Sequence, residues 1–136
     1  MTTSITYEGQ LRCTAVHNQS KTAIETDAPT DNKGKGERFS PTDLVCTALG
    51  TCLLTTMAIK ALDIDIELTG TSVDVQKHMS QDAPRRIVKI EVFVKFPSLN
   101  VDAKNKEYLQ RIGDNCPVAK SLHPDVDQVI TYEWAN

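Results

Sequence analysis

Apolar and polar residues alternate along several short segments of the chain, which is the pattern of strands with one buried face. Gly70 interrupts one of these runs, which indicates a bulge or turn, and Pro97 ends the clearest of them. A turn is predicted at residues 17–21 and a polar loop at 27–38. The predicted strands are residues 4–17, 22–26, 64–68, 73–75, 88–96 and 129–134.

A long apolar segment, residues 44–62, has the spacing of a helix instead. Ser40 suits the N-cap, Pro41 the first helical position, and Asp43 can cap the N–H of Ser40 in return. Because apolar residues cover most of its circumference, we predict that this helix is central and buried. Gly50 lies among small residues, where a neighbouring segment could approach closely.

Two shorter helices are predicted after the clearest strand. One spans residues 103–112 and is stopped by Gly113, and the other runs from Pro117 to just before Pro124. Strands, a long helix, strands, helices and a last strand follow one another, which predicts an α+β fold with a largely antiparallel sheet. The length favours a single domain over residues 1–136.

Composition and charge narrow the function classes. Hydrophobic residues make up 40% and charged residues 24%, as in a soluble globular protein. A formal net charge of −3 argues against a broad contact with nucleic acid or an anionic membrane. The N-terminus lacks the pattern of a secretory signal, and the long apolar segment carries several threonines and a lysine. We therefore expect a cytoplasmic protein with one buried helix rather than a membrane span.

Four cysteines are the most informative chemical groups in such a chain. They include no C-x-x-C pair and no zinc-finger spacing, so we expect no metal and no stable structural disulfide. Cys13 and Cys46 share their periodicity with apolar neighbours and are interpreted as core residues. Cys52, inside the long helix, and Cys116, at a helix start, are the candidates for a reactive dithiol.

Thiol chemistry requires a thiolate, and a reactive site must therefore supply positive potential. Cys116 precedes Pro117, so the free N–H groups of the following helix are expected to favour its anion. Cys52 lies well beyond the first turn of its helix and needs a cation from elsewhere in the fold. The candidates are Arg12, Arg38, Arg85, Arg86 and Arg111.

Two groups of motifs together resemble the osmotically inducible protein C family, which includes the organic hydroperoxide resistance proteins (OsmC/Ohr). The order of the predicted elements agrees with that family over nearly the whole chain. The segments that carry the resemblance are Asp27-Ala28-Pro29, Gly34-Lys35-Gly36-Glu37, Phe39-Ser40-Pro41-Thr42-Asp43-Leu44, Ala48-Leu49-Gly50-Thr51-Cys52 and Cys116-Pro117-Val118-Ala119-Lys120-Ser121-Leu122-His123-Pro124.

The resemblance implies an intertwined homodimer in which sheets surround long central helices and both subunits build each active site. It also implies a thiol-dependent peroxidase that reduces small organic hydroperoxides and is regenerated by a small or lipoyl-type dithiol reductant. By position, Cys52 matches the peroxidatic cysteine, Cys116 the resolving cysteine, and Arg12 the arginine that activates the thiolate. No metal or other cofactor is expected.

One position departs from the family pattern. A glutamate that follows the helix-opening proline orients the arginine in the well-studied hydroperoxidases, whereas this chain has Thr42 there and Asp43 next. The orienting acid is then Asp43 or Glu37, or is absent. The alternative function is a non-catalytic stress protein on the same scaffold that senses redox state or binds an apolar ligand. A zinc-binding module is a further alternative, but Cys116 and its neighbours supply too few metal ligands for it.

Overall fold

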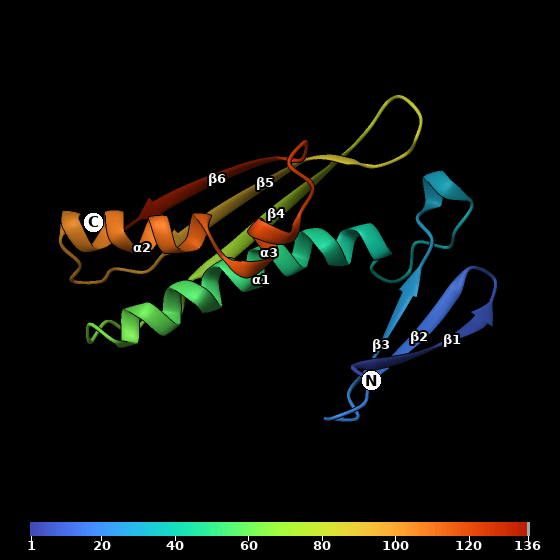
Figure 1. Ribbon diagram of the computed structural model, residues 1–136, viewed down its shortest axis with the longest axis horizontal. Helices are drawn as coiled ribbons and strands as arrows, with labels where there is room; N and C mark the ends of the chain where they lie inside the picture. The colour runs from blue at the N-terminus through green and yellow to red at the C-terminus, as the bar shows by residue number, and fades with distance from the viewer. Residues whose placement is uncertain (136) are drawn as a thin grey trace. The chain divides into compact units, whose positions relative to one another are not determined.

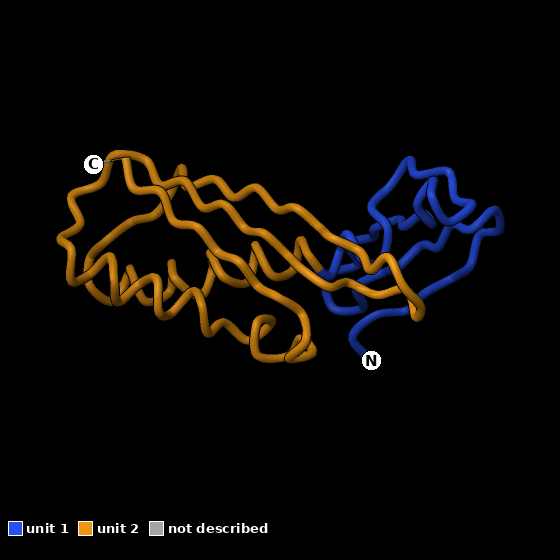
Figure 2. The backbone as a smooth tube through the Cα atoms, turned by 90° about the horizontal axis from the view of Figure 1, so that it is seen from above, with its two compact units in different colours: residues 1–45 blue, residues 46–136 orange. Residues whose placement is uncertain are grey.

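The computed structural model describes residues 1–135, which form two compact units. Unit 1 comprises residues 1–45 and unit 2 begins at Cys46, as Figure 2 shows by colour. The long helix α1 (Pro41–Leu62) starts in unit 1 and continues through unit 2.

Unit 1 contains a three-stranded antiparallel sheet in the order β1-β2-β3, and a short 3₁₀ helix, η1 (Thr30–Asn32), follows it. Its strands are β1 (Thr3–Gly9), β2 (Arg12–His17) and β3 (Ala23–Asp27). The prediction of one strand over residues 4–17 is therefore wrong, because a hairpin turn interrupts it at Gln10 and Leu11, both with positive φ. A register shift between Tyr7 and Gly9 pairs Tyr7 with Cys13, so residues of the same parity share a face and the sequence pattern continues through the turn.

The start of α1 follows from its local sequence. The hydroxyl of Ser40 accepts the backbone N–H of Asp43 at 3.0 Å, and a carboxylate oxygen of Asp43 accepts the N–H of Ser40 at 2.9 Å. This reciprocal pair satisfies two N–H groups that the helix leaves unpaired. The predicted capping arrangement at Ser40, Pro41 and Asp43 is confirmed.

Unit 2 holds a second three-stranded sheet in the order β4-β5-β6 (Figure 1). Its strands are β4 (Ser72–Met79), β5 (Ile87–Phe96) and β6 (Asp127–Trp134). β4 pairs antiparallel with β5, whereas β6 pairs parallel with β5. The molecule is thus α+β and its strand pairs are largely antiparallel, with one parallel exception.

The strand predicted at residues 64–68 does not form. The backbone N–H groups of Ile64 and Ile66 both bond to the carbonyl of Ala61, in the last turn of α1, and Asp65 has a positive φ. These residues close the end of the helix, whose last carbonyl groups need partners. Their apolar side chains alternate because of that turn and not because of a sheet.

Helices α2 (Ala103–Asp114) and α3 (Pro117–Ser121) follow β5, and with α1 they lie on one face of the second sheet (Figure 1). The fully buried side chains of Ile90, Val92 and Val94 point from β5 toward them. Gly113 does not stop α2 as predicted, because it lies inside the last turn of that helix.

Helix α1 buries one face and exposes another in the single chain. Leu49, Leu53 and Met57 are fully buried in the core, whereas Ile59 and Leu62 are 61% and 58% exposed. By length and hydropathy alone the helix could cross a bilayer, but its buried face packs as the core helix of unit 2. The exposed face therefore carries apolar side chains.

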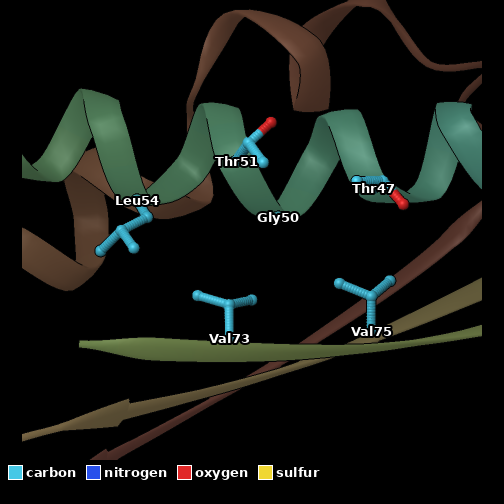
Figure 3. A pocket seen from close by; sticks show the side chains of 6 residues that line it. All are labelled: Thr47, Gly50, Thr51, Leu54, Val73 and Val75. Carbon is cyan, nitrogen blue, oxygen red and sulfur yellow. The ribbon is translucent and has the colours of Figure 1, made fainter. Parts of the chain in front are cut away.

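The small residues of α1 allow strand β4 to pack closely against the helix. A methyl group added at Gly50 would lie 2.9 Å from a methyl of Val75 and 3.2 Å from one of Val73. Figure 3 shows both valines directed from β4 toward the helix. A small cavity of about 130 Å³ remains beside this contact, lined by Thr47, Gly50, Thr51, Leu54, Val73 and Val75.

Candidate active site

Unit 2 brings Cys52 and Cys116 together. Cys52 projects from the middle of α1, and Cys116 is the N-cap residue of α3. The Cys52 side chain raises the pKa of the Cys116 thiol, so the two side chains are close neighbours, and both cysteines are free thiols. The sulfur atoms of residues far apart in the sequence therefore share one site, as a reactive dithiol requires.

The two thiols differ in their surroundings. Cys52 is half-buried, and its sulfur lies 3.9 Å from the hydroxyl of Thr56. Cys116 is 0% exposed, and its sulfur accepts the backbone N–H of Ala119 at 3.5 Å. The accessible thiol is thus Cys52, with Cys116 enclosed behind it.

Burial dominates the ionisation of Cys116. Desolvation raises the pKa of its thiol, the N–H of Ala119 lowers it, and the neighbouring Cys52 raises it. The N–H groups at the helix start favour the anion of Cys116 as expected, but burial outweighs them and the net pKa is raised. A neutral thiol at this position suits a group that reacts second.

This asymmetry predicts an order of alkylation. We expect iodoacetamide at neutral pH to modify Cys52 at least about tenfold faster than Cys116, because Cys116 lacks both access and thiolate character. Peptide mass spectrometry over time measures the two rates. In denaturant the difference should vanish, and faster labelling of Cys116 in the folded protein would contradict the structure.

Arg12 lies in unit 1, on β2, where two carboxylates hold its guanidinium. Its Nε and Nη2 donate to the two oxygens of Asp27 at 2.7 and 2.8 Å, and Nη2 also donates to Glu37 at 3.2 Å. The bond to Asp27 raises the pKa of Arg12, and the same bond holds the pKa of Asp27 below its usual value. Within residues 1–135, Nη1 of Arg12 has no hydrogen-bond partner, so one edge of the cation can receive an anionic group.

Asp27 is the residue that sequence reasoning missed. It stands directly opposite Arg12 in the β2–β3 register, and it is 1% exposed. Its carboxylate also accepts the backbone N–H of Glu37 at 3.0 Å, which brings the end of the glycine-containing loop to the cation. The signal was a charged residue at the end of a strand, but its meaning depends on a register that the pattern did not specify.

The two acids suggested by the sequence have different places. Glu37 contacts Arg12 through one longer bond, whereas the carboxylate of Asp43 caps α1 at Ser40. Three of the other candidate arginines bind carboxylates through contacts near the surface: Arg38 with Glu25, Arg86 with Asp82 and Arg111 with Glu107.

Of the two remaining cysteines, only Cys46 has the predicted core position. Cys46 is buried with Leu53 and Met57, whereas Cys13 is half-exposed on β2. Among the described residues, no three His, Cys, Asp or Glu side chains are grouped so that they could hold a metal ion.

Comparisons with known proteins identify the family and the fold. The model of the OsmC-like protein family matches residues 34–130. A crystal structure from Psychrobacter arcticus, of a candidate osmotic stress induced and detoxification response protein, is 44% identical, with a TM-score of 0.93 over 98% of this chain and 96% of that one. A search of the curated proteins gives no match.

More distant structures share the fold. An organic hydroperoxide resistance protein OsmC from Legionella pneumophila is 14% identical, with a TM-score of 0.75 over 98% of this chain and 97% of that one. An organic hydroperoxide resistance protein from Elizabethkingia anophelis is also 14% identical, with a TM-score of 0.75 and coverage of 98% and 96%.

Proposed function

Because the chain belongs to the OsmC-like protein family, we propose that it is a thiol-dependent peroxidase that reduces organic hydroperoxides with Cys52 and Cys116. The single observation that carries the proposal is the neighbouring pair of free thiols, one accessible and one enclosed. Proteins named for organic hydroperoxide resistance have the same fold, which supports this substrate class.

The reaction has two steps within the protein. The Cys52 thiolate attacks the terminal oxygen of the hydroperoxide, so that an S–O bond forms, the O–O bond breaks and the alkoxide leaves as an alcohol after taking a proton. Cys116 then attacks the resulting sulfenic acid: an S–S bond forms, the S–O bond breaks, and hydroxide leaves as water with the Cys116 proton. A dithiol reductant, for which we propose a lipoyl-type group, returns both sulfurs to thiols.

Arg12 is proposed to stabilise the negative charge of this reaction. Its bidentate bond to Asp27 fixes the plane of the guanidinium and leaves Nη1 for the Cys52 thiolate and the departing oxygen. Asp27 thereby takes the place that the family assigns to a glutamate, and Glu37 supports the same cation from the side.

We further propose that the protein acts as a homodimer in the cytoplasm. Helix α1 carries exposed apolar residues, and Ile5 and Ile24 lie exposed on one face of the first sheet. A second copy of the chain could cover this apolar surface. Covering Cys52 in this way would exclude water and favour organic over hydrogen peroxide. A reducing compartment keeps such thiols ready for reaction.

One equivalent of cumene hydroperoxide tests the proposal. We expect the intact mass to fall by two hydrogens, with a new link between Cys52 and Cys116 in the peptide map. The same amount of hydrogen peroxide should react more slowly if the site is apolar. Free thiols that survive the organic hydroperoxide would contradict the proposal and favour the non-catalytic alternative.

A further inference from the structure

Tyr132 of β6 is bound to the end of helix α2, two residues before Cys116. Its hydroxyl donates to a carboxylate oxygen of Asp114, with the two oxygens 2.8 Å apart, and it also lies 3.2 Å from the carbonyl oxygen of Gln110. Burial and the bond to Asp114 raise the pKa of Tyr132, and the neighbouring Cys116 raises it further. The phenol is thus a neutral donor close to the enclosed thiol.

Gly113 makes this close contact possible. A methyl group added there would lie 2.5 Å from the hydroxyl oxygen of Tyr132 and 2.8 Å from the sulfur of Met57. Glycine within a helix costs about 1 kcal/mol relative to alanine, so a packing reason for it is expected. The carbonyl of Gly113 also accepts the backbone N–H of Cys116 at 3.2 Å. Gly113 therefore links Tyr132 directly to the backbone of Cys116.

Cys116 lies in the hydrophobic core at the start of the short α3 helix. The helix has five residues, and Pro117 has no N–H to donate. Helix α3 is also hydrogen-bonded to β6, because the side-chain amide of Gln128 donates to the carbonyl of Ala119 at 3.0 Å. The place of the thiol thus depends on how β6 holds the α2–α3 junction.

From these contacts we propose that Tyr132, acting with Gly113 and Asp114, is the positioning residue that sets how fast Cys116 closes the disulfide on oxidised Cys52. This rests on the proposed function. A disulfide tolerates only a narrow range of Cα separation and dihedral angle, so a small displacement of the junction slows closure. The attack of the Cys52 thiolate on the peroxide does not involve this junction.

Tyr132→Phe separates the two steps, because it removes the hydroxyl and keeps the ring that stacks with Phe96. We expect Cys52 oxidation by cumene hydroperoxide at the rate of the unmodified protein, with disulfide closure slowed about fivefold, as loss of one net hydrogen bond implies. Dimedone trapping of the sulfenic acid and mass spectrometry of quenched samples measure both rates.

Gln110→Met is the matched control. It removes the bond that the Gln110 side chain accepts from the Trp134 indole at 2.9 Å, which also ties α2 to β6 but lies farther from Cys116. We expect a similar loss of unfolding free energy with closure within about twofold of the unmodified protein. Equal slowing by both variants would show a general loss of stability and overturn the proposal, as would normal closure in Tyr132→Phe.

Gly113→Ala supplies a second test. The added methyl should slow closure, and Tyr132→Phe in the same chain should partly restore the rate, because it removes the oxygen in the way. Failure of the wild-type thiols to react with hydroperoxide would instead refute the proposed function. In that event, equilibration with glutathione tests the positioning: Tyr132→Phe should shift the equilibrium about fivefold toward the dithiol, and no shift would overturn the inference.

Discussion

Replacement of Cys52 with serine is expected to lower the rate of cumene hydroperoxide reduction by about a thousandfold or more. The serine hydroxyl remains protonated at neutral pH and cannot attack the O–O bond as a thiolate does. The loss is measured as hydroperoxide consumption with a dihydrolipoyl compound as reductant. Cys116→Ser should behave differently, because it leaves the first oxidation intact and traps Cys52 as a sulfenic acid.

Cys13→Ser is the control for this series. Cys13 is partly buried on β2 in unit 1, and no step of the proposed reaction uses its thiol. We therefore expect activity close to that of the unmodified protein. A Cys52→Ser variant that kept a substantial part of the activity would rule out Cys52 as the attacking group.

Asp27→Asn should reduce peroxidase activity about ten- to a hundredfold, because Arg12 loses the bidentate carboxylate that fixes its orientation. Glu37→Gln should have a smaller effect, since Glu37 makes one bond of 3.2 Å and its side chain is 58% exposed. Asp43→Ala should lower the free energy of unfolding by about 1 kcal/mol through loss of the helix cap, with activity retained. A reversed ranking of Asp27 and Asp43 would contradict the assignment.

The Asp27→Asn variant should also change how the free energy of unfolding depends on pH. Because Arg12 lowers the pKa of Asp27 in the folded state, the unfolded chain takes up this proton first as the pH falls. The contribution of Asp27 to stability is complete above the usual carboxyl pKa of about 4 and is lost as the pH falls through the lower folded value. Urea unfolding at a series of acidic pH values should therefore show a shallower loss of stability for Asp27→Asn.

Local signals account for the parts of the fold that the sequence predicted well. The start of α1 depends on three neighbouring residues, and the strand at 88–96 depends on its own alternation. The missed hairpin at Gln10 and the false strand at 64–68 have one cause. Alternation reports which side chains share a side of the chain, but it does not report where the backbone turns.

The candidate site, like the fold, could be predicted only in part from the sequence. Cys52 and Cys116 were predicted as partners because the two motifs around them resemble those of a known family. Asp27 was missed because its role depends on lying across from Arg12 in a sheet. At Cys116 the sequence indicated the favourable helix start but not the burial that outweighs it. Register and desolvation are properties of the assembled fold.

The parallel pairing of β6 with β5 has a consequence for the order of folding. Parallel neighbours require a long crossover, and here the crossover consists of α2, α3 and the loops around them, with Cys116 at the start of α3. Such non-local contacts form late, because the entropy of closing the loop is lost before the pairing compensates for it. We therefore expect Cys52 and Cys116 to come together near the end of folding. Before that stage, a newly made molecule has Cys52 in place without Cys116 beside it.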